Sequence, residues 1–204
     1  MKSCLVLCSG GVDSVTAAAW LRHEQWSVHL LCINYGQIMA KTERSAAEQC
    51  ARHLGLAQPI VMELPGVGLW GQGSIVERGS AGSNGEYFPH RNLFLIGTAT
   101  VVAASLGAEA VAMGIIASET ADYADCRPEF LKTSKMTLAT LFPPLDLLTP
   151  FDAMTKIEVV KLALDLDVPL GSTFSCNCRS GRHCWECTGC LERQETFEAL
   201  GVSL

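Results

Sequence analysis

The chain has 204 residues, of which 49% are apolar and 18% are charged, and its formal net charge at neutral pH is −6. This length suits one α/β domain, or one domain with a small appendage, and the apolar content argues against a disordered chain. An acidic chain with no basic run is not expected to bind bulk nucleic acid, although recognition of a single nucleotide stays open.

The opening stretch, MKSCLVLCSGG, holds too short an apolar run for a signal peptide. No stretch reaches the roughly 18 apolar residues of a membrane-spanning helix. We therefore expect a cytoplasmic protein with no membrane partner, whose ten cysteines stay reduced. Five of them lie between Cys176 and Cys190, which indicates a metal site. The others are expected as small buried side chains: Cys4, Cys8, Cys32, Cys50 and Cys126.

Short apolar runs alternate with longer segments of helical periodicity, which is typical of a parallel sheet flanked by helices. The expected strands are 4–8, 28–33, 60–64 and 110–114. The expected helices are 14–24, 42–54, a segment that Asn92 caps and Gly107 ends, 128–141 and 155–166. These elements predict a βαβαβ arrangement with right-handed crossovers. The glycine-rich residues 65–89 and the polar residues 117–127 are expected as long loops, the first of which closes over a ligand.

The motif SGGVDS, residues 9–14, lies where the first strand passes into the first helix. In a parallel sheet this is the edge where ligands bind. Gly10 and Gly11 allow a tight turn, and Asp13 and Ser14 suit the first turn of a helix. Free amides at a helix start bind anions, so the motif predicts an anion site. It is neither a P-loop nor a dinucleotide fingerprint, and the alternative is a plain capped turn.

With this motif the chain resembles the PP-loop ATP pyrophosphatases, whose S-G-G-x-D-S sequence holds the pyrophosphate end of ATP. The resemblance implies ATP and Mg²⁺, and an enzyme that adenylates a carboxylate, amide or carbonyl oxygen and releases pyrophosphate. It also implies a Rossmann-like fold of the adenine nucleotide alpha hydrolase type, an α/β fold with helices on both faces of a parallel sheet. The residues implied in ATP binding are Cys8, Ser9, Gly10, Gly11, Val12, Asp13, Ser14 and Gly114.

Four further motifs narrow this resemblance, and each lies at a strand end or a helix start. They are NYGQ at 34–37, FPHRN at 88–92, DYADCRPEF at 122–130 and TKIE at 155–158. Together with the cysteine-rich tail they are similar to the QueC family over nearly the whole chain. Such ligases adenylate 7-carboxy-7-deazaguanine, form the amide with ammonia and dehydrate it with a second ATP to 7-cyano-7-deazaguanine, on the route to queuosine. The resemblance also implies a homodimer.

Several polar residues are candidates for this chemistry. Arg91 and Lys156 are cations at helix starts, where the helix dipole disfavours them, so an anionic ligand explains them better than folding does. Arg127 offers a planar fork for a carboxylate or phosphate, and Asp13 and Asp125 are candidate Mg²⁺ ligands. For these charges the alternative is a solvated surface group. The resemblance implies substrate contacts from Tyr35, Gln37, Asn92, Glu119 and Tyr123, although both tyrosines could be ordinary core or rim aromatics.

The cysteine-rich tail contains the spacing C-x7-C-x2-C-x2-C, formed by Cys176, Cys184, Cys187 and Cys190. Four thiolates at this spacing suit a closed, structural Zn²⁺ site, and the QueC resemblance implies the same four ligands. Cys178 is an extra thiol that could replace Cys176. His183 is a weaker substitute, and an iron-sulfur cluster is the alternative. We expect a PP-loop domain over residues 1–170 and a zinc-binding module over 171–204.

Several positions depart from the family's usual pattern. His90 stands where V-P-G-R-N has glycine, and Asn34 stands where D-Y-G-Q has aspartate. In the loop that usually reads D-[FY]-S-G-Y-P-D-C-R, an aspartate, a glycine and a proline are replaced by Glu119, Asp122 and Ala124. Added carboxylate and imidazole groups change the acid–base options of a site. An alternative product is therefore an amide with another amine, such as a peptide or protein acceptor, and divergent relatives occur in antiviral defence cassettes.

Two other functions stay open. A PP-loop ligase or thiolase that acts directly on tRNA needs a basic face or an added RNA-binding domain, and the acidic charge and short chain argue against it. A non-catalytic nucleotide-binding scaffold would bind ATP without releasing pyrophosphate. The presence of SGGVDS together with Arg91, Arg127 and Lys156 favours an enzyme.

Overall fold

The computed structural model describes residues 1–70, 75–76, 88–121, 123–178 and 181–203. Within them, five parallel strands form one sheet in the order β3-β2-β1-β4-β5. The strands are β1 (Ser3–Leu7), β2 (Ser27–Asn34), β3 (Ile60–Glu63), β4 (Ala110–Met113) and β5 (Asp146–Leu148). The helices are α1 (Val12–His23), α2 (Ala40–His53), α3 (Arg91–Leu106), α4 (Pro128–Ala139), α5 (Lys156–Asp165) and α6 (Thr188–Ala199). Short 3₁₀ turns are η1 (Pro65–Trp70), η2 (Ala124–Cys126) and η3 (Leu170–Ser172).

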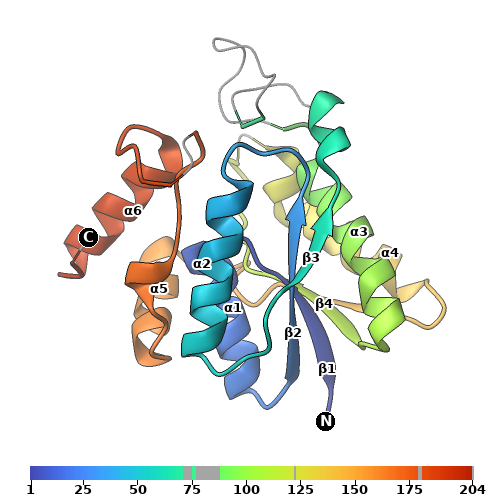
Figure 1. The fold of residues 1–204 in the computed structure, drawn as a ribbon. Helices are drawn as coiled ribbons and strands as arrows, with labels where there is room; N and C mark the ends of the chain where they lie inside the picture. Colours follow the sequence, from blue (N-terminus) through green and yellow to red (C-terminus); the bar gives the residue numbers. More distant parts are fainter. Residues whose placement is uncertain (71–74, 77–87, 122, 179–180, 204) are drawn as a thin grey trace.

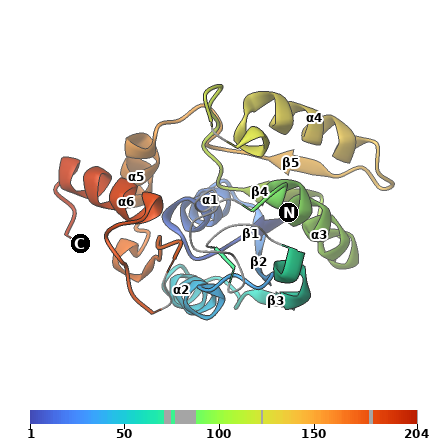
Figure 2. The same cartoon turned by 90° about the horizontal axis from the view of Figure 1, so that it is seen from above.

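The strands separate two hydrophobic layers, because successive side chains of a strand point to opposite faces of the sheet. Leu5 and Leu7 of β1 pack with α3 and α4, whereas Cys4 and Val6 pack with α1, α2 and α5. Figures 1 and 2 show these two groups of helices on opposite sides of the sheet, with α6 against α5. The predicted α/β fold with helices on both faces is therefore confirmed.

The predicted strands and helices are all present, with ends shifted by a few residues. Strand β5 was not predicted because it is only three residues long, and α6 was not predicted because its mostly polar sequence has little apolar periodicity. Gly107, at φ +65°, ends α3 as expected. The prediction that Asn92 caps α3 is wrong: His90, at φ +57°, occupies the cap position, and the Asn92 side chain donates to the carbonyl of Asp125.

The order of the strands reverses between β1 and β4, because the chain moves outward through β2 and β3 and then returns to the other side of β1. Such a reversal opens a crevice at the carboxyl ends of the strands, where α/β proteins bind ligands. The predicted loop 65–89 contains η1 and a bridge between Gln37 and Val76, and its remaining part, 71–74 and 77–87, lies outside the described residues. Asp122 also lies outside them. Among the described residues, none of the helices has the length and apolar character needed to cross a bilayer.

Candidate functional site

A cavity of about 750 Å³ opens at the carboxyl ends of β1, β2 and β4. Its size falls within the range of small-molecule and cofactor sites. It is lined by the turn after β1, the segment after β2, the start of α3 and the end of β4, with a further wall from Lys156, Phe174 to Asn177 and Glu192. The strand reversal therefore coincides with the largest concentration of predicted site residues.

The glycine-serine turn forms one wall of this cavity. Gly10 has φ +76°, and a Cβ atom at this position would lie 2.6 Å from the Glu43 carbonyl oxygen, so the turn packs against the first turn of α2 as only glycine can. Gly11 is the N-cap of α1, and the Ser14 hydroxyl donates to its carbonyl at 3.1 Å. The Ser9 hydroxyl lies 3.5 Å from that of Ser14. Because the first amides of a helix lack intrahelical partners, they remain available to an anion.

Gly114 brings the end of β4 against this turn. A Cβ atom on Gly114 would lie 2.3 Å from the backbone oxygen of Asp13, which is too close for any side chain. The residue that follows β4 therefore packs directly on the backbone of the first turn of α1. Gly114 lines the cavity, as its predicted place in ATP binding requires.

Lys156 reaches the same turn from the start of α5. Its Nζ lies 2.8 Å from Asp13 Oδ2 and 3.0 Å from Glu192 Oε2. A capping box fixes the start of the helix: the Thr155 hydroxyl accepts from the Glu158 amide, and the Glu158 carboxylate accepts from the Thr155 amide. Burial opposes the charge on Lys156, but the two carboxylates outweigh burial and hold its pKa above the ordinary value. Lys156 is therefore a fixed cation at the cavity wall.

Asp13 fits a Mg²⁺ ion. Its Oδ1 is buried and has no hydrogen-bond partner among the described residues, while Oδ2 faces Lys156. A buried carboxylate oxygen left without a partner is costly, and Mg²⁺ in nucleotide sites usually takes one or two carboxylates together with phosphate oxygens. The chemistry of the Asp13 carboxylate is therefore suited to a divalent metal ion.

The second half of the cavity lies between α2 and α3. Gln37 is held by three hydrogen bonds: its Oε1 accepts from the Tyr35 amide, and its Nε2 donates to the Ile33 carbonyl and to Glu43 Oε2 at 2.8 Å. The side-chain amide thereby aims the Glu43 carboxylate. Burial raises the pKa of Glu43, against the hydrogen bond from Gln37 and the charge of Arg91.

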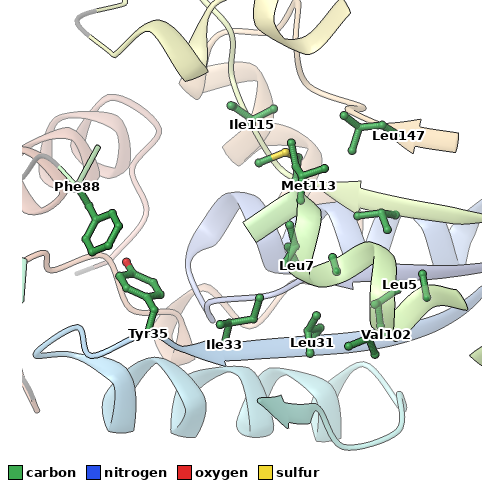
Figure 3. Packing of buried hydrophobic residues seen from close by; sticks show 14 of the residues in the cluster. Leu5, Leu7, Leu31, Ile33, Tyr35, Phe88, Val102, Met113, Ile115 and Leu147 are labelled. Atoms are coloured by element: carbon green, nitrogen blue, oxygen red, sulfur yellow. The ribbon is translucent and has the colours of Figure 1, made fainter. Parts of the chain in front are cut away.

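Arg91 lies close enough to Tyr35 and to this carboxylate for its charge to oppose the effect of burial on the pKa of both groups. The ring of Tyr35 is buried and meets Phe88 edge-on, with ring centroids 5.4 Å apart, and Figure 3 shows the two rings pointing toward one another. Because the ring is enclosed by Phe88 and Phe94, it is a wall of the cavity rather than a free stacking surface.

Three predicted site residues do not themselves line the cavity. Asp125 Oδ2 accepts from the Asn92 amide at 2.9 Å and thereby satisfies the first turn of α3. Arg127 is exposed, and its Nε donates to the carbonyl of Ala121. Glu119 is exposed in the loop before η2. None of the three is among the described residues that line the cavity, whereas Asn92 and Tyr123 are.

The cysteine-rich tail gathers its thiols in one place. The sulfurs of Cys176, Cys178, Cys184 and Cys187 all lie within 4.8 Å of one another. Cys190 Sγ lies 3.9 Å from that of Cys184. A tetrahedral zinc site with Zn–S bonds of about 2.3 Å has sulfurs about 3.8 Å apart, so the donor set and its spacing fit Zn²⁺. Five thiols thus lie near a site that takes four ligands. The four whose sulfurs all lie within 4.8 Å of one another include Cys178, which was predicted as an extra thiol, and do not include Cys190, which was predicted as a ligand.

Residues 3–201 match the family described as "Queuosine biosynthesis protein QueC". The chain belongs to the QueC family. Relatives of this QueC chain include the 7-cyano-7-deazaguanine synthase of Methanospirillum hungatei, which is 33% identical over 96% of this chain and 94% of the relative. The 7-cyano-7-deazaguanine synthase of Archaeoglobus fulgidus is 35% identical over 99% of this chain and 88% of the relative. The family predicted from the motifs is confirmed.

Solved structures share the fold of this QueC chain. The U34-tRNA thiolase NcsA from Methanococcus maripaludis, solved with its [4Fe-4S] cluster, has a TM-score of 0.59 and 15% identity, over 98% of this chain and 64% of that one. A 4-thiouridine synthetase, solved with RNA and ATP, has a TM-score of 0.55 and 15% identity, over 98% of this chain and 50% of that one. These neighbours confirm the fold.

Two carboxylates of this QueC chain were missed by the sequence reasoning. Glu43 lies on α2, six residues after Gln37, and a spacing of that kind carries no motif signal of its own. Glu192 lies two residues after the last cysteine, Cys190, and only its position near the predicted metal ligands could have drawn attention to it. Both side chains line the cavity.

Proposed function

We propose that this QueC protein uses ATP to adenylate the carboxylate of a 7-deazaguanine and then joins the activated carbon to nitrogen. The cavity is the observation that supports this proposal. One part of it is lined by the turn at residues 9–14 with Lys156, and another part is lined by the polar side chains of Glu43 and Arg91. A nucleotide and a small bicyclic acid need these two kinds of surface side by side. Membership of the QueC family supports the choice of substrate.

In the nucleotide half, the amides that open α1 and the hydroxyls of Ser9 and Ser14 bind the pyrophosphate end of ATP. Lys156 neutralises the charge that develops as pyrophosphate leaves. Asp13 would hold Mg²⁺, which supplies further neutralisation of phosphate charge when bound. Arg127 and Asp125 are left out of this assignment, because neither lines the cavity.

In the substrate half, the Glu43 carboxylate accepts hydrogen bonds from the N–H groups on the pyrimidine edge of the base. Guanine-like rings present two such donors side by side, which match the two oxygens of a carboxylate. Arg91 also lines this half of the cavity, and we assign its guanidinium to the carboxylate of the substrate.

The reaction then needs no protein nucleophile. A carboxylate oxygen attacks the α-phosphorus of ATP, the bond to the β-phosphate oxygen breaks, and pyrophosphate leaves. Ammonia attacks the acyl carbon, loses a proton and expels AMP to give the amide. A second ATP adenylates the amide oxygen with release of pyrophosphate, and loss of AMP and of both amide protons gives the nitrile. With a peptide or protein amine in place of ammonia, the reaction would end at the amide.

The cysteine cluster would hold Zn²⁺ as a structural ion. All donors are thiols, and a closed four-sulfur site has no position for water. We assign the ion no part in the chemical steps. A homodimer and the division of the chain at residue 170 remain predictions from the sequence.

Pyrophosphate release in the presence of ATP and 7-carboxy-7-deazaguanine tests this function, with the product mass separating nitrile, amide and conjugate. The Glu43→Gln variant is expected to raise the KM for the carboxylate about tenfold to hundredfold, since it removes a charged hydrogen-bond acceptor, and to leave the KM for ATP unchanged. Glu48→Gln on the same helix is the control, because Glu48 pairs with Arg44 on the surface. Equal effects of both variants would contradict the role of Glu43.

A further inference from the structure

We propose that Glu192 is a positioning residue that couples the cysteine cluster to the nucleotide site. The inference rests on the proposed function, because it assumes that Lys156 faces the phosphates of ATP. Glu192 Oε2 lies 3.0 Å from Lys156 Nζ, which also contacts Asp13 at 2.8 Å. The Lys156 side chain is only 19% exposed, so the position of its ammonium is set by the two carboxylates around it.

Glu192 belongs to the helix that the thiols anchor. Helix α6 begins after Cys187, its N-cap, and Cys190 in its first turn is completely buried. Glu192 follows two residues later on the same helix. Any change in how the cluster holds Cys187 and Cys190 therefore moves the carboxylate that faces Lys156.

Arg193 fixes the same helix from its other side. The guanidinium is buried and donates to the Leu170 carbonyl and the Thr173 hydroxyl, each at 2.8 Å. Gly189 packs so closely on the segment after Thr173 that a Cβ atom there would lie 2.3 Å from the Ser175 carbonyl oxygen. Helix α6 and residues 170–175 therefore move as one unit.

This unit also contacts the glycine-serine turn directly. The Phe174 amide donates to the Gly10 carbonyl at 2.9 Å, two residues before the thiol of Cys176. The cluster thus reaches the nucleotide site by two connections, one through the side chains of Glu192 and Lys156 and one through the backbone at Phe174. Both end on the turn at residues 9–14.

Two sites joined in this way must influence each other equally, because a coupling free energy is reciprocal. A metal ion that fixes α6 favours the arrangement of Lys156 that binds phosphate. Bound nucleotide, in turn, holds Lys156 and Glu192 and slows loss of the metal. A substitution of Glu192 can therefore weaken this coupling while all the cysteines stay in place.

The test measures transfer of Zn²⁺ from the zinc-loaded full chain to a chromogenic chelator, with and without an ATP analogue that cannot be cleaved between its α- and β-phosphates. In the wild type the analogue is expected to slow zinc release at least about fivefold, the lower end of typical coupling. Glu192→Gln is expected to remove at least half of this protection, measured as the logarithm of the rate ratio. Glu192→Asp keeps the negative charge and is expected to retain part of the protection. Glu195→Gln changes an exposed residue on the same helix and is expected to leave the protection unchanged.

Binding of the analogue to each variant is measured separately by calorimetry, at concentrations that saturate the site. Equal protection in the wild type and in Glu192→Gln overturns the proposal, as does a saturated wild type that loses zinc at an unchanged rate. A chain that takes up no zinc overturns it too. Failure of the proposed function looks different, because it leaves protection intact and abolishes pyrophosphate release.

Discussion

Lys156 Nζ lies 2.8 Å from Asp13 Oδ2, although 143 residues separate them in the chain. The contact joins the start of α5 to the turn after β1 and places a cation and an acid side by side at the cavity wall. A cation at the N-terminus of a helix is unfavourable for that helix. The contact with Asp13 explains why the chain keeps it there.

Replacing Lys156 by alanine is expected to lower substrate-dependent pyrophosphate release by about 100-fold to 1,000-fold, since one preorganised charge at the leaving group is lost. Thermal unfolding monitors whether the fold survives. The control is Lys161→Ala on the same helix, where the side chain is exposed. Full activity of the Lys156 variant would contradict the assignment of this lysine to the leaving pyrophosphate.

Alanine at Gly10 or at Gly114 is expected to disrupt the nucleotide site. At Gly10 the new Cβ lies 2.6 Å from a backbone oxygen in a left-handed conformation, and at Gly114 it lies 2.3 Å from one. Both positions are backed by main chain, which cannot move aside locally. Calorimetry should show loss of ATP binding together with a lower melting temperature.

Gly97→Ala is the matched control for these two variants. Gly97 lies in α3, is exposed, and leaves open space for a Cβ atom. Alanine there is expected to stabilise the protein by up to about 1 kcal/mol, because glycine is a poor helix former. Destabilisation at Gly97 as well would contradict the assignment of these effects to the close backbone contacts at Gly10 and Gly114.

The capping box that places Lys156 is expected to depend on pH. The Thr155 amide and hydroxyl hold the pKa of Glu158 below its ordinary value of 4.5. A lowered folded-state pKa contributes stability above the unfolded pKa and loses it as the pH falls through the folded value. The melting temperature of Glu158→Gln should therefore lie below that of the wild type at neutral pH, and the two should converge as the pH falls below about 4.5. A constant difference across this range would contradict the assignment.

Much of this architecture could be predicted, and the reason is local. The strands β1, β2 and β4 are short apolar runs, and the glycines and polar residues of SGGVDS predict a tight turn. The parallel order then brings the ends of β1, β2 and β4 to one edge. For the same reason, the residues of SGGVDS and Gly114 could be predicted to lie at this edge, where most of them line the cavity.

The other half depended on long-range contacts, which no local pattern contains. Glu43 belongs to the site only because Gln37 aims it there, and Glu192 only because α6 folds back to α5. Conversely, Asp125 resembled a metal ligand in the sequence, but one of its carboxylate oxygens accepts from the amide of Asn92, and Asp125 is not among the described residues that line the cavity. Polar residues in a motif can serve the fold of a loop, and only the hydrogen bonds reveal which of them do.

The thiol ligands can be assigned by single replacements with serine and measurement of bound metal. Cys187→Ser is expected to lose zinc and to lower the melting temperature, since a closed site loses a ligand. Cys50→Ser, in the buried face of α2, should keep its zinc. Comparing Cys178→Ser with Cys190→Ser shows which of these thiols completes the site. An iron chromophore in the purified protein would contradict zinc.

In the proposed reaction, a substrate carboxylate attacks the α-phosphorus of ATP. Labelling both carboxylate oxygens of 7-carboxy-7-deazaguanine with oxygen-18 tests this step, because adenylation moves one of these oxygens to AMP. Mass spectrometry of a single turnover with ammonia should find one oxygen-18 atom in AMP and unlabelled pyrophosphate. Oxygen-18 in inorganic phosphate together with formation of ADP, or unlabelled AMP, would contradict adenylation of the carboxylate.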